Sequence, residues 1–140
     1  MQIVRSLGKY QLVPLLFSQV DLAAAQTAAA LLPIEATGGG TAIAYTMPFA
    51  GEIVGISFST TAAATAGSLT AVPTIATVVC TDPSAAVTTA TYASDTCNRG
   101  TNVFSKNAQI GAKITTTAGW DATGADLILQ VWVILKVEGI

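Results

Sequence analysis

The C-terminal segment from Asp126 to Val137 carries the strongest secondary-structure signal in the chain. Its odd-numbered positions hold only Leu and Val, whereas its even-numbered positions from 128 to 136 hold Ile, Gln, Trp, Ile and Lys. An alternation with a period of two places these two sets on opposite faces of a β-strand. We therefore expect a closing strand whose first face points into a core and whose second face is covered by another sheet or by a neighbouring subunit.

This segment is too short to be a membrane anchor. Its apolar run from Leu127 to Leu135 has nine residues and is interrupted by Gln130, whereas a membrane-spanning helix needs about 20. We expect no membrane partner. On the mixed face, Trp132 and Ile134 are the candidate residues of a subunit interface, since large apolar side chains anchor such contacts.

Short strand-like runs separated by turn residues recur from residue 41 onward. We expect strands over 42–47, 52–60, 68–80, 86–93 and 108–116, with polar or small-residue loops between them. Pro73 cannot donate to a strand ladder, which indicates an edge strand or a bulge. Expected inward side chains are Val54, Ile56 and Phe58, and later Ile110, Ala112 and Ile114. The pattern predicts an all-β, antiparallel β-sandwich or small barrel.

The N-terminal region is predicted to be an extended arm over residues 1–15, followed by a single β-domain over residues 16–140. The arm would bind by adding a strand to a neighbour's sheet. Its candidate docking residues, in it and just after it, are Arg5, Tyr10, Leu12, Val13, Leu15, Leu16 and Phe17. A signal peptide is the alternative, but the apolar patch is short and contains Gln11 and Pro14, which favours the arm.

The alanine-rich stretch 21–32 allows two interpretations. Asp21 could cap a short helix that Pro33 ends, because alanine has the highest helix propensity. We favour two short strands around Gln26 and Thr27, since the later segments are strand-like. Residues 37–41, which contain three glycines, are expected to form a flexible loop without phosphate-binding spacing.

The composition limits the possible functions. Only 10% of residues are charged, against about 25% in typical domains, so a surface of small residues indicates obligate assembly; an ordinary soluble β-domain is the alternative. The chain has no histidine, and its eight carboxylates are isolated in sequence, which argues against an enzyme, a metal site or a cofactor. The six cations are scattered, so we expect no nucleic-acid binding.

The two cysteines, Cys80 and Cys97, are separated by 16 residues and cannot form a CxxC pair or a zinc site alone. A disulfide between them would stabilise the fold by about 3 kcal/mol. Two buried free thiols are the alternative. We favour the disulfide because Cys97 lies in a polar segment where a lone thiol would be exposed.

An ordered series of motifs then points to a family. It comprises Met47-Pro-Phe-Ala-Gly-Glu-Ile-Val-Gly-Ile-Ser57, Ala66-Gly-Ser-Leu-Thr70, Arg99-Gly-Thr-Asn-Val-Phe104, Ile110-Gly-Ala-Lys-Ile-Thr-Thr116 and Thr123-Gly-Ala-Asp126. Over roughly residues 40–136, this series resembles capsid decoration (cement) proteins of tailed bacteriophages and related head-fibre domains.

The resemblance implies a β-sandwich or a β-tulip or jelly-roll-like domain that forms a homotrimer on the outer surface of the virion. There it would clamp neighbouring major capsid proteins, often through an N-terminal arm. A host-receptor or glycan-binding knob on the virion is the alternative, because the same fold serves both roles. A secreted bacterial surface protein is a third possibility.

Overall fold

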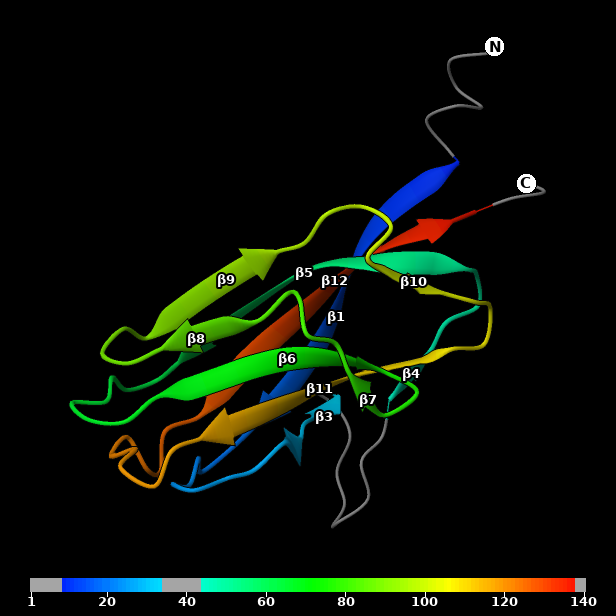
Figure 1. Ribbon diagram of the computed structural model, residues 1–140. Helices are drawn as coiled ribbons and strands as arrows, with labels where there is room; N and C mark the ends of the chain where they lie inside the picture. Colours follow the sequence, from blue (N-terminus) through cyan, green and yellow to red (C-terminus); the bar gives the residue numbers. More distant parts are fainter. Residues whose placement is uncertain (1–8, 34–43, 138–140) are drawn as a thin grey trace.

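Every regular element is a β-strand in the parts of the chain that the computed structural model describes, residues 9–33 and 44–137 (Figure 1). The strands form two six-stranded sheets in which all pairings are antiparallel. The two sheets enclose one hydrophobic core. The predicted all-β, sandwich-type fold is therefore confirmed.

Sheet A has the strand order β10-β5-β12-β1-β3, and β9 pairs with β5 beside β10. Its strands are β1 (Tyr10–Gln19), β3 (Leu32–Pro33), β5 (Gly51–Thr60), β9 (Tyr92–Thr96), β10 (Asn102–Phe104) and β12 (Leu127–Lys136).

Sheet B has the order β2-β11-β6-β7, with β4 on β11 and β8 on β6. Its strands are β2 (Ala29–Ala30), β4 (Tyr45–Thr46), β6 (Leu69–Ile75), β7 (Val78–Val79), β8 (Ala85–Val87) and β11 (Gln109–Thr116).

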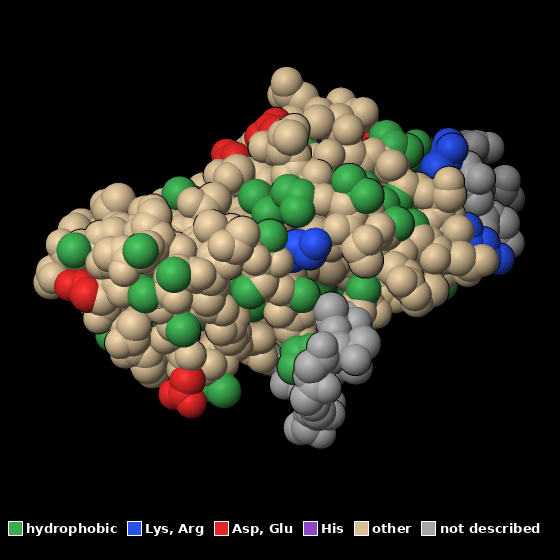
Figure 2. Space-filling view, turned by 60° about the horizontal axis from the view of Figure 1, so that its bottom comes forward, with side chains coloured by type: hydrophobic (Ala, Val, Ile, Leu, Met, Phe, Trp, Pro, Cys, Tyr) green, Lys and Arg blue, Asp and Glu red, His purple; other side chains and the backbone are tan. Residues whose placement is uncertain are grey.

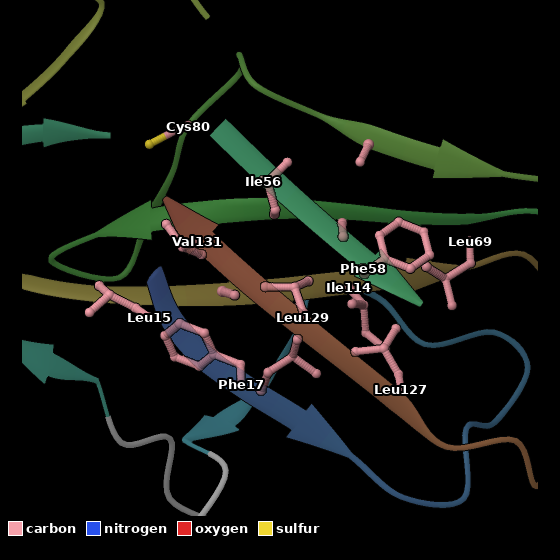
Figure 3. Close-up of a cluster of buried hydrophobic side chains, with 14 of the residues drawn as sticks. Leu15, Phe17, Ile56, Phe58, Leu69, Cys80, Ile114, Leu127, Leu129 and Val131 are labelled. Atoms are coloured by element: carbon pink, nitrogen blue, oxygen red, sulfur yellow. The ribbon is translucent and has the colours of Figure 1, made fainter. Parts of the chain in front are cut away.

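The predicted closing strand is β12, which lies in the middle of sheet A between β5 and β1. Leu127, Leu129, Val131 and Val133 are all at most 1% exposed, as the alternation predicts. Side chains from both sheets meet them in the core, including Phe58 of sheet A and Ile114 of sheet B (Figure 3). The prediction that Ile110, Ala112 and Ile114 point inward is also confirmed.

The predicted boundary of the N-terminal arm is wrong. β1 begins at Tyr10 and pairs with β12 along its whole length, from Tyr10 opposite Lys136 to Gln19 opposite Leu127. Leu15 and Phe17 are buried in the chain's own core, so they are not docking residues. The physical reason is that β12 is a central strand and needs a partner on this side. The rest of the predicted arm, including Arg5, lies outside the described residues.

A β-bulge changes one residue of the predicted inner face of β5. The register with β12 passes from Gly55 opposite Trp132 to Ile53 opposite Val133, so Val54 is the extra residue. A bulge of this kind reverses the alternation beyond it. The predicted inward positions of Ile56 and Phe58 are confirmed, whereas Ile53 is buried in place of Val54, which is only half-buried.

Several predicted strands have different limits. The expected strand 68–80 is a hairpin of β6 and β7, and the expected strand 86–93 is divided between β8 and β9. Pro73 of β6 is buried and lies opposite Ala112 of β11. It falls between the part of β6 that pairs with β7 and the part that pairs with β8. The stretch 21–32 contains no helix, and its strands follow Thr27 instead of surrounding it. The predicted loop 37–41 and the start of the strand 42–47 lie outside the described residues.

Candidate interaction surface

The outer face of sheet A, which points away from sheet B, is the candidate functional surface. Because the odd-numbered residues of β12 are buried, its even-numbered residues point outward, and the register carries the same face across β1, β5, β9 and β10. The face consists of Tyr10, Leu12, Pro14, Leu16, Glu52, Gly55, Ser57, Ser59, Tyr92, Ser94, Thr96, Val103, Ile128, Gln130, Trp132, Ile134 and Lys136.

Large apolar side chains are concentrated on this face. Eight large hydrophobic residues are exposed in the described part of the chain, and five of them belong to it: Tyr10 (47% exposed), Leu12 (60%), Tyr92 (72%), Val103 (64%) and Ile128 (50%). In the view of Figure 2, hydrophobic side chains are scattered in small groups over a surface that is mostly other side chains and backbone. Contiguous exposed apolar area on a folded domain marks a site of protein association.

A shallow groove of about 360 Å³ runs along the middle of the outer face, between Trp132 with Leu12 on one side and β9 on the other. Gly55 lies in its lining, and a Cβ added there would come within 3.2 Å of the Asp95 carbonyl oxygen. Trp132 is fixed in place because its Nε1 donates to Ser57 Oγ (3.1 Å), which in turn donates to Gln130 Oε1 (2.9 Å). The groove is therefore pre-formed, with an oriented indole as its largest apolar element.

A second hollow of about 320 Å³ lies at the end of the outer face where β1 begins and β12 ends. Arg99 Nε donates to Glu52 Oε1 (2.7 Å), and the backbone N–H of Gly100 donates to the same oxygen (3.0 Å). The hydrogen bond from Arg99 is the main reason that the pKa of Glu52 lies below its usual value. The Tyr10 ring is close to Lys9 Nζ (5.7 Å) and to Arg99 Cζ (5.9 Å), distances at which cation–π attraction acts.

The structure places the predicted site residues in two groups. Tyr10, Leu12, Leu16, Trp132 and Ile134 share the outer face of sheet A, so the two residues predicted for a subunit interface lie beside part of the predicted arm. Val13, Leu15 and Phe17 point the other way, toward the core.

In that second group, the Phe17 ring packs edge-on against Tyr45 (5.3 Å between centroids, 87°).

The sequence prediction missed Gly55, Tyr92 and Val103 on the outer face. Tyr92 and Val103 are large apolar residues in short polar segments, and that contrast was the only available signal.

The predicted disulfide is wrong, because both cysteines are free thiols. Cys80 is buried, and Cys97 is half-buried with its Sγ donating to the Ile53 carbonyl (3.2 Å). Burial raises the pKa of both thiols. The error came from assigning Cys97 to an exposed loop, whereas its backbone N–H donates to the Val54 carbonyl (3.1 Å) next to β5.

The described residues contain no cluster of three or more His, Cys, Asp or Glu side chains that could hold a metal ion. They also contain no helix long and apolar enough to cross a membrane. Neither a scan against protein-family models nor a search of curated proteins found a match for this chain.

Proposed function

We propose that the protein is a non-enzymatic structural protein of a tailed-phage virion. It would decorate the outer surface of the capsid and stabilise it by bridging neighbouring major capsid proteins. The observation that carries this proposal is the set of five exposed apolar side chains on one ordered sheet face. The sequence resemblance to decoration proteins supplies the identity of the partner, and the low charge of the chain agrees with a protein that works in an assembly.

Docking in this proposal uses the folded domain itself. Residues 10–17, which were expected to reach a neighbouring subunit, belong to β1. The outward side chains among them are therefore held in place by the chain's own sheet and would contact the capsid from there. Each exposed Leu or Ile that becomes buried adds up to about 1.5–3 kcal/mol before the costs of association are subtracted. Many weak contacts on one symmetric shell would then act together through multivalency.

Co-sedimentation with the expanded capsids of its phage tests this function. We expect the double variant Leu12→Ser, Ile128→Ser to lose capsid binding, because both side chains are at least half exposed on the outer face. The matched control is Val78→Ser, Val79→Ser, which changes two exposed apolar residues of β7 in sheet B. Equal binding by both variants and the unchanged protein would remove the outer face of sheet A from the proposal.

The alternative proposal is a receptor- or glycan-binding knob on the virion, and the groove beside Trp132 favours it. The partly buried indole of Trp132, which lines the groove beside Ser94 and Thr96, has the chemistry of a sugar-stacking site. Asp95 would contribute less to sugar binding than these residues, because its carboxylate already accepts a hydrogen bond from the Ser84 N–H (2.9 Å). Binding of the isolated protein to host cells or their polysaccharide, lost in Trp132→Ala but retained in Val103→Ser, Ile128→Ser, two exposed residues that do not line the groove, would favour the knob over the decoration protein.

A further inference from the structure

We propose that a hollow on the outer face of sheet B binds a carboxylate group, carried by a small molecule or by the free C-terminus of a peptide. The hollow has a volume of about 240 Å³. It lies over β11, between the ends of β2 and β4 on one side and β6 with its turn into β7 on the other. Since it uses none of the outer face of sheet A, this inference does not rest on the proposed function.

The hollow exists because no strand of the described chain pairs with the middle of β11 on the side away from β6. β2 pairs with β11 at Lys113, and β4 pairs with it at Gln109. Between these two contacts lies Gly111, which has no side chain to fill the space. A Cβ at this position would lie 2.7 Å from Thr74 Oγ1, so a larger residue would displace that hydroxyl.

Three polar side chains surround this space. Because the even-numbered residues of β11 are buried in the core, Gln109 and Lys113 point outward, with Gly111 between them. Thr74 lies opposite Gly111 in the register of β6 and β11, two strands that run side by side in Figure 1, so it belongs to the same face. A hydroxyl, an amide and an ammonium group therefore line one opening.

Thr74 provides the observation that points to a ligand. The residue is only 4% exposed, yet its hydroxyl has no hydrogen-bond partner among the described residues. Buried hydroxyls are nearly always paired, because an unpaired one loses its bond to water without a replacement. Among the described residues, Trp120 Nε1 is the unpartnered side-chain atom that is fully enclosed. Thr74 Oγ1 is therefore open to the hollow that it lines, where a ligand would supply its acceptor.

Lys113 provides a positive charge at the same opening. Its Nζ donates to the Thr77 carbonyl (3.1 Å), which leaves two of its three N–H donors for another acceptor. The salt bridge that the described residues form joins Arg99 to Glu52, so none of their carboxylates pairs with Lys113. The described residues that line the hollow also include no Asp or Glu. An acidic ligand would meet an attractive charge without a competing carboxylate.

The turn between β6 and β7 holds Lys113 in position. Ala76 and Thr77 both have positive φ angles (50° and 68°), a conformation that is rare for a β-branched residue such as Thr. The Ala76 N–H donates to the Gln109 carbonyl (2.9 Å), and the Thr77 carbonyl accepts from Lys113, so the turn is bonded to β11 at two places. The ammonium group is therefore oriented before a ligand arrives, which lowers the entropic cost of binding.

The donors select a carboxylate over other ligands. A metal ion would need oxygen ligands with negative charge, whereas the hollow presents a cation. A phosphate carries more charge and is usually held by Arg or by several cations. A carboxylate has one charge and two acceptor oxygens, one for Lys113 and one for the Thr74 hydroxyl or the Gln109 amide. Leu31 and Ala44, which also line the hollow, would contact the carbon atoms beside it.

Heteronuclear NMR of the full chain, which follows each backbone N–H, tests the proposal with three probes. N-acetylglycine imitates the C-terminus of a peptide, acetate is a small carboxylate, and N-acetylglycinamide is the uncharged control. We expect saturable shifts at Thr74, Gln109, Gly111 and Lys113 with both carboxylates, with a Kd of about 1–10 mM. Tighter binding of N-acetylglycine would identify a peptide as the source, and tighter binding of acetate a small molecule. Equal shifts with the amide, or no saturable shifts with either acid, would overturn the inference.

Two substitutions test the named side chains. Lys113→Met keeps an unbranched side chain but removes the charge, and Thr74→Val keeps the shape of Thr but removes the hydroxyl. We expect Lys113→Met to weaken N-acetylglycine binding by about tenfold or more, and Thr74→Val by about three- to tenfold. The control is Thr70→Val, on the same strand and face but outside the hollow. Unchanged affinity in both test variants, or an equal loss in the control, would contradict the site.

Thermal unfolding separates a binding role of Thr74 from a structural one. Because its hydroxyl has no partner in the described chain, we expect Thr74→Val to melt at or above the temperature of the unchanged protein although it binds the carboxylate less tightly. A clearly lower melting temperature would show that the hydroxyl serves the fold and would contradict its assignment as a ligand donor.

The outcomes also separate this inference from the proposed function. Lys113→Met and Thr74→Val leave the outer face of sheet A intact, so both should co-sediment with capsids as the unchanged protein does. An unchanged protein that binds carboxylates but ignores capsids would remove only the decoration role. Capsid binding by a protein whose NMR spectrum does not respond to either acid would remove only the carboxylate site.

Discussion

The position of β1 inside sheet A leads to a quantitative prediction for Phe17→Ala. Phe17 is fully buried and packs edge-on against Tyr45, whereas Leu12 on the same strand is 60% exposed. Truncating a buried Phe costs about 3–5 kcal/mol through lost burial and the cavity left behind. Truncating Leu12 costs about 1 kcal/mol, because most of its side chain already contacts water in the free chain.

Urea unfolding followed by circular dichroism measures this difference. With an m-value of about 1.5 kcal/mol/M, we expect the unfolding midpoint of Phe17→Ala to fall by about 2–3 M and that of Leu12→Ala by less than about 1 M. The measurement should be made at low protein concentration, since association adds to apparent stability. If Phe17→Ala does not fold, Phe17→Leu provides a milder loss of about 1–2 kcal/mol. Equal shifts for Phe17→Ala and Leu12→Ala would refute the packing of β1 on its own chain's core.

Three further predictions concern a glycine, a carboxylate and the two thiols. Gly67 has φ +79°, and a Cβ there would lie 2.4 Å from the Trp120 nitrogen, so Gly67→Ala should cost about 2–4 kcal/mol. Gly100→Ala, with φ +85° but open space around it, should cost only about 1–2 kcal/mol; similar melting temperatures for the two variants would contradict this. The Thr65 hydroxyl, followed by the N–H groups of Thr65 and Ala66, lowers the pKa of Asp121, so its contribution to stability is present above the unfolded pKa and is lost as pH falls through the lower folded value. Asp121→Asn should therefore lose less stability than the unchanged protein between about pH 5 and pH 2, and parallel pH curves would disprove this. Half-buried Cys97 should react with a thiol reagent before buried Cys80, with both slower than free cysteine because burial raises both pKa values; a native protein without titratable thiols would contradict it.

The sequence was most informative where both faces of a strand are encoded locally. The period-two pattern of β12 identified its core residues correctly, because apolar and mixed positions alternate over the whole strand. β1 was missed because its pairing is set by residues more than 100 positions away, as in Tyr10 opposite Lys136. The outward Tyr10, Leu12, Pro14 and Leu16 also disguise its alternation, since they make both faces apolar.

The candidate surface could be predicted only in part for the same reason. Trp132 and Ile134 belong to the best-predicted strand, so their face was clear. Tyr92 and Val103 join that face only because β9 and β10 pair with different halves of β5, on either side of the Val54 bulge. A bulge adds one residue without a reliable sequence signature, so periodicity predicted Ile56 and Phe58 correctly but neither the burial of Ile53 in place of Val54 nor the neighbours of Gly55.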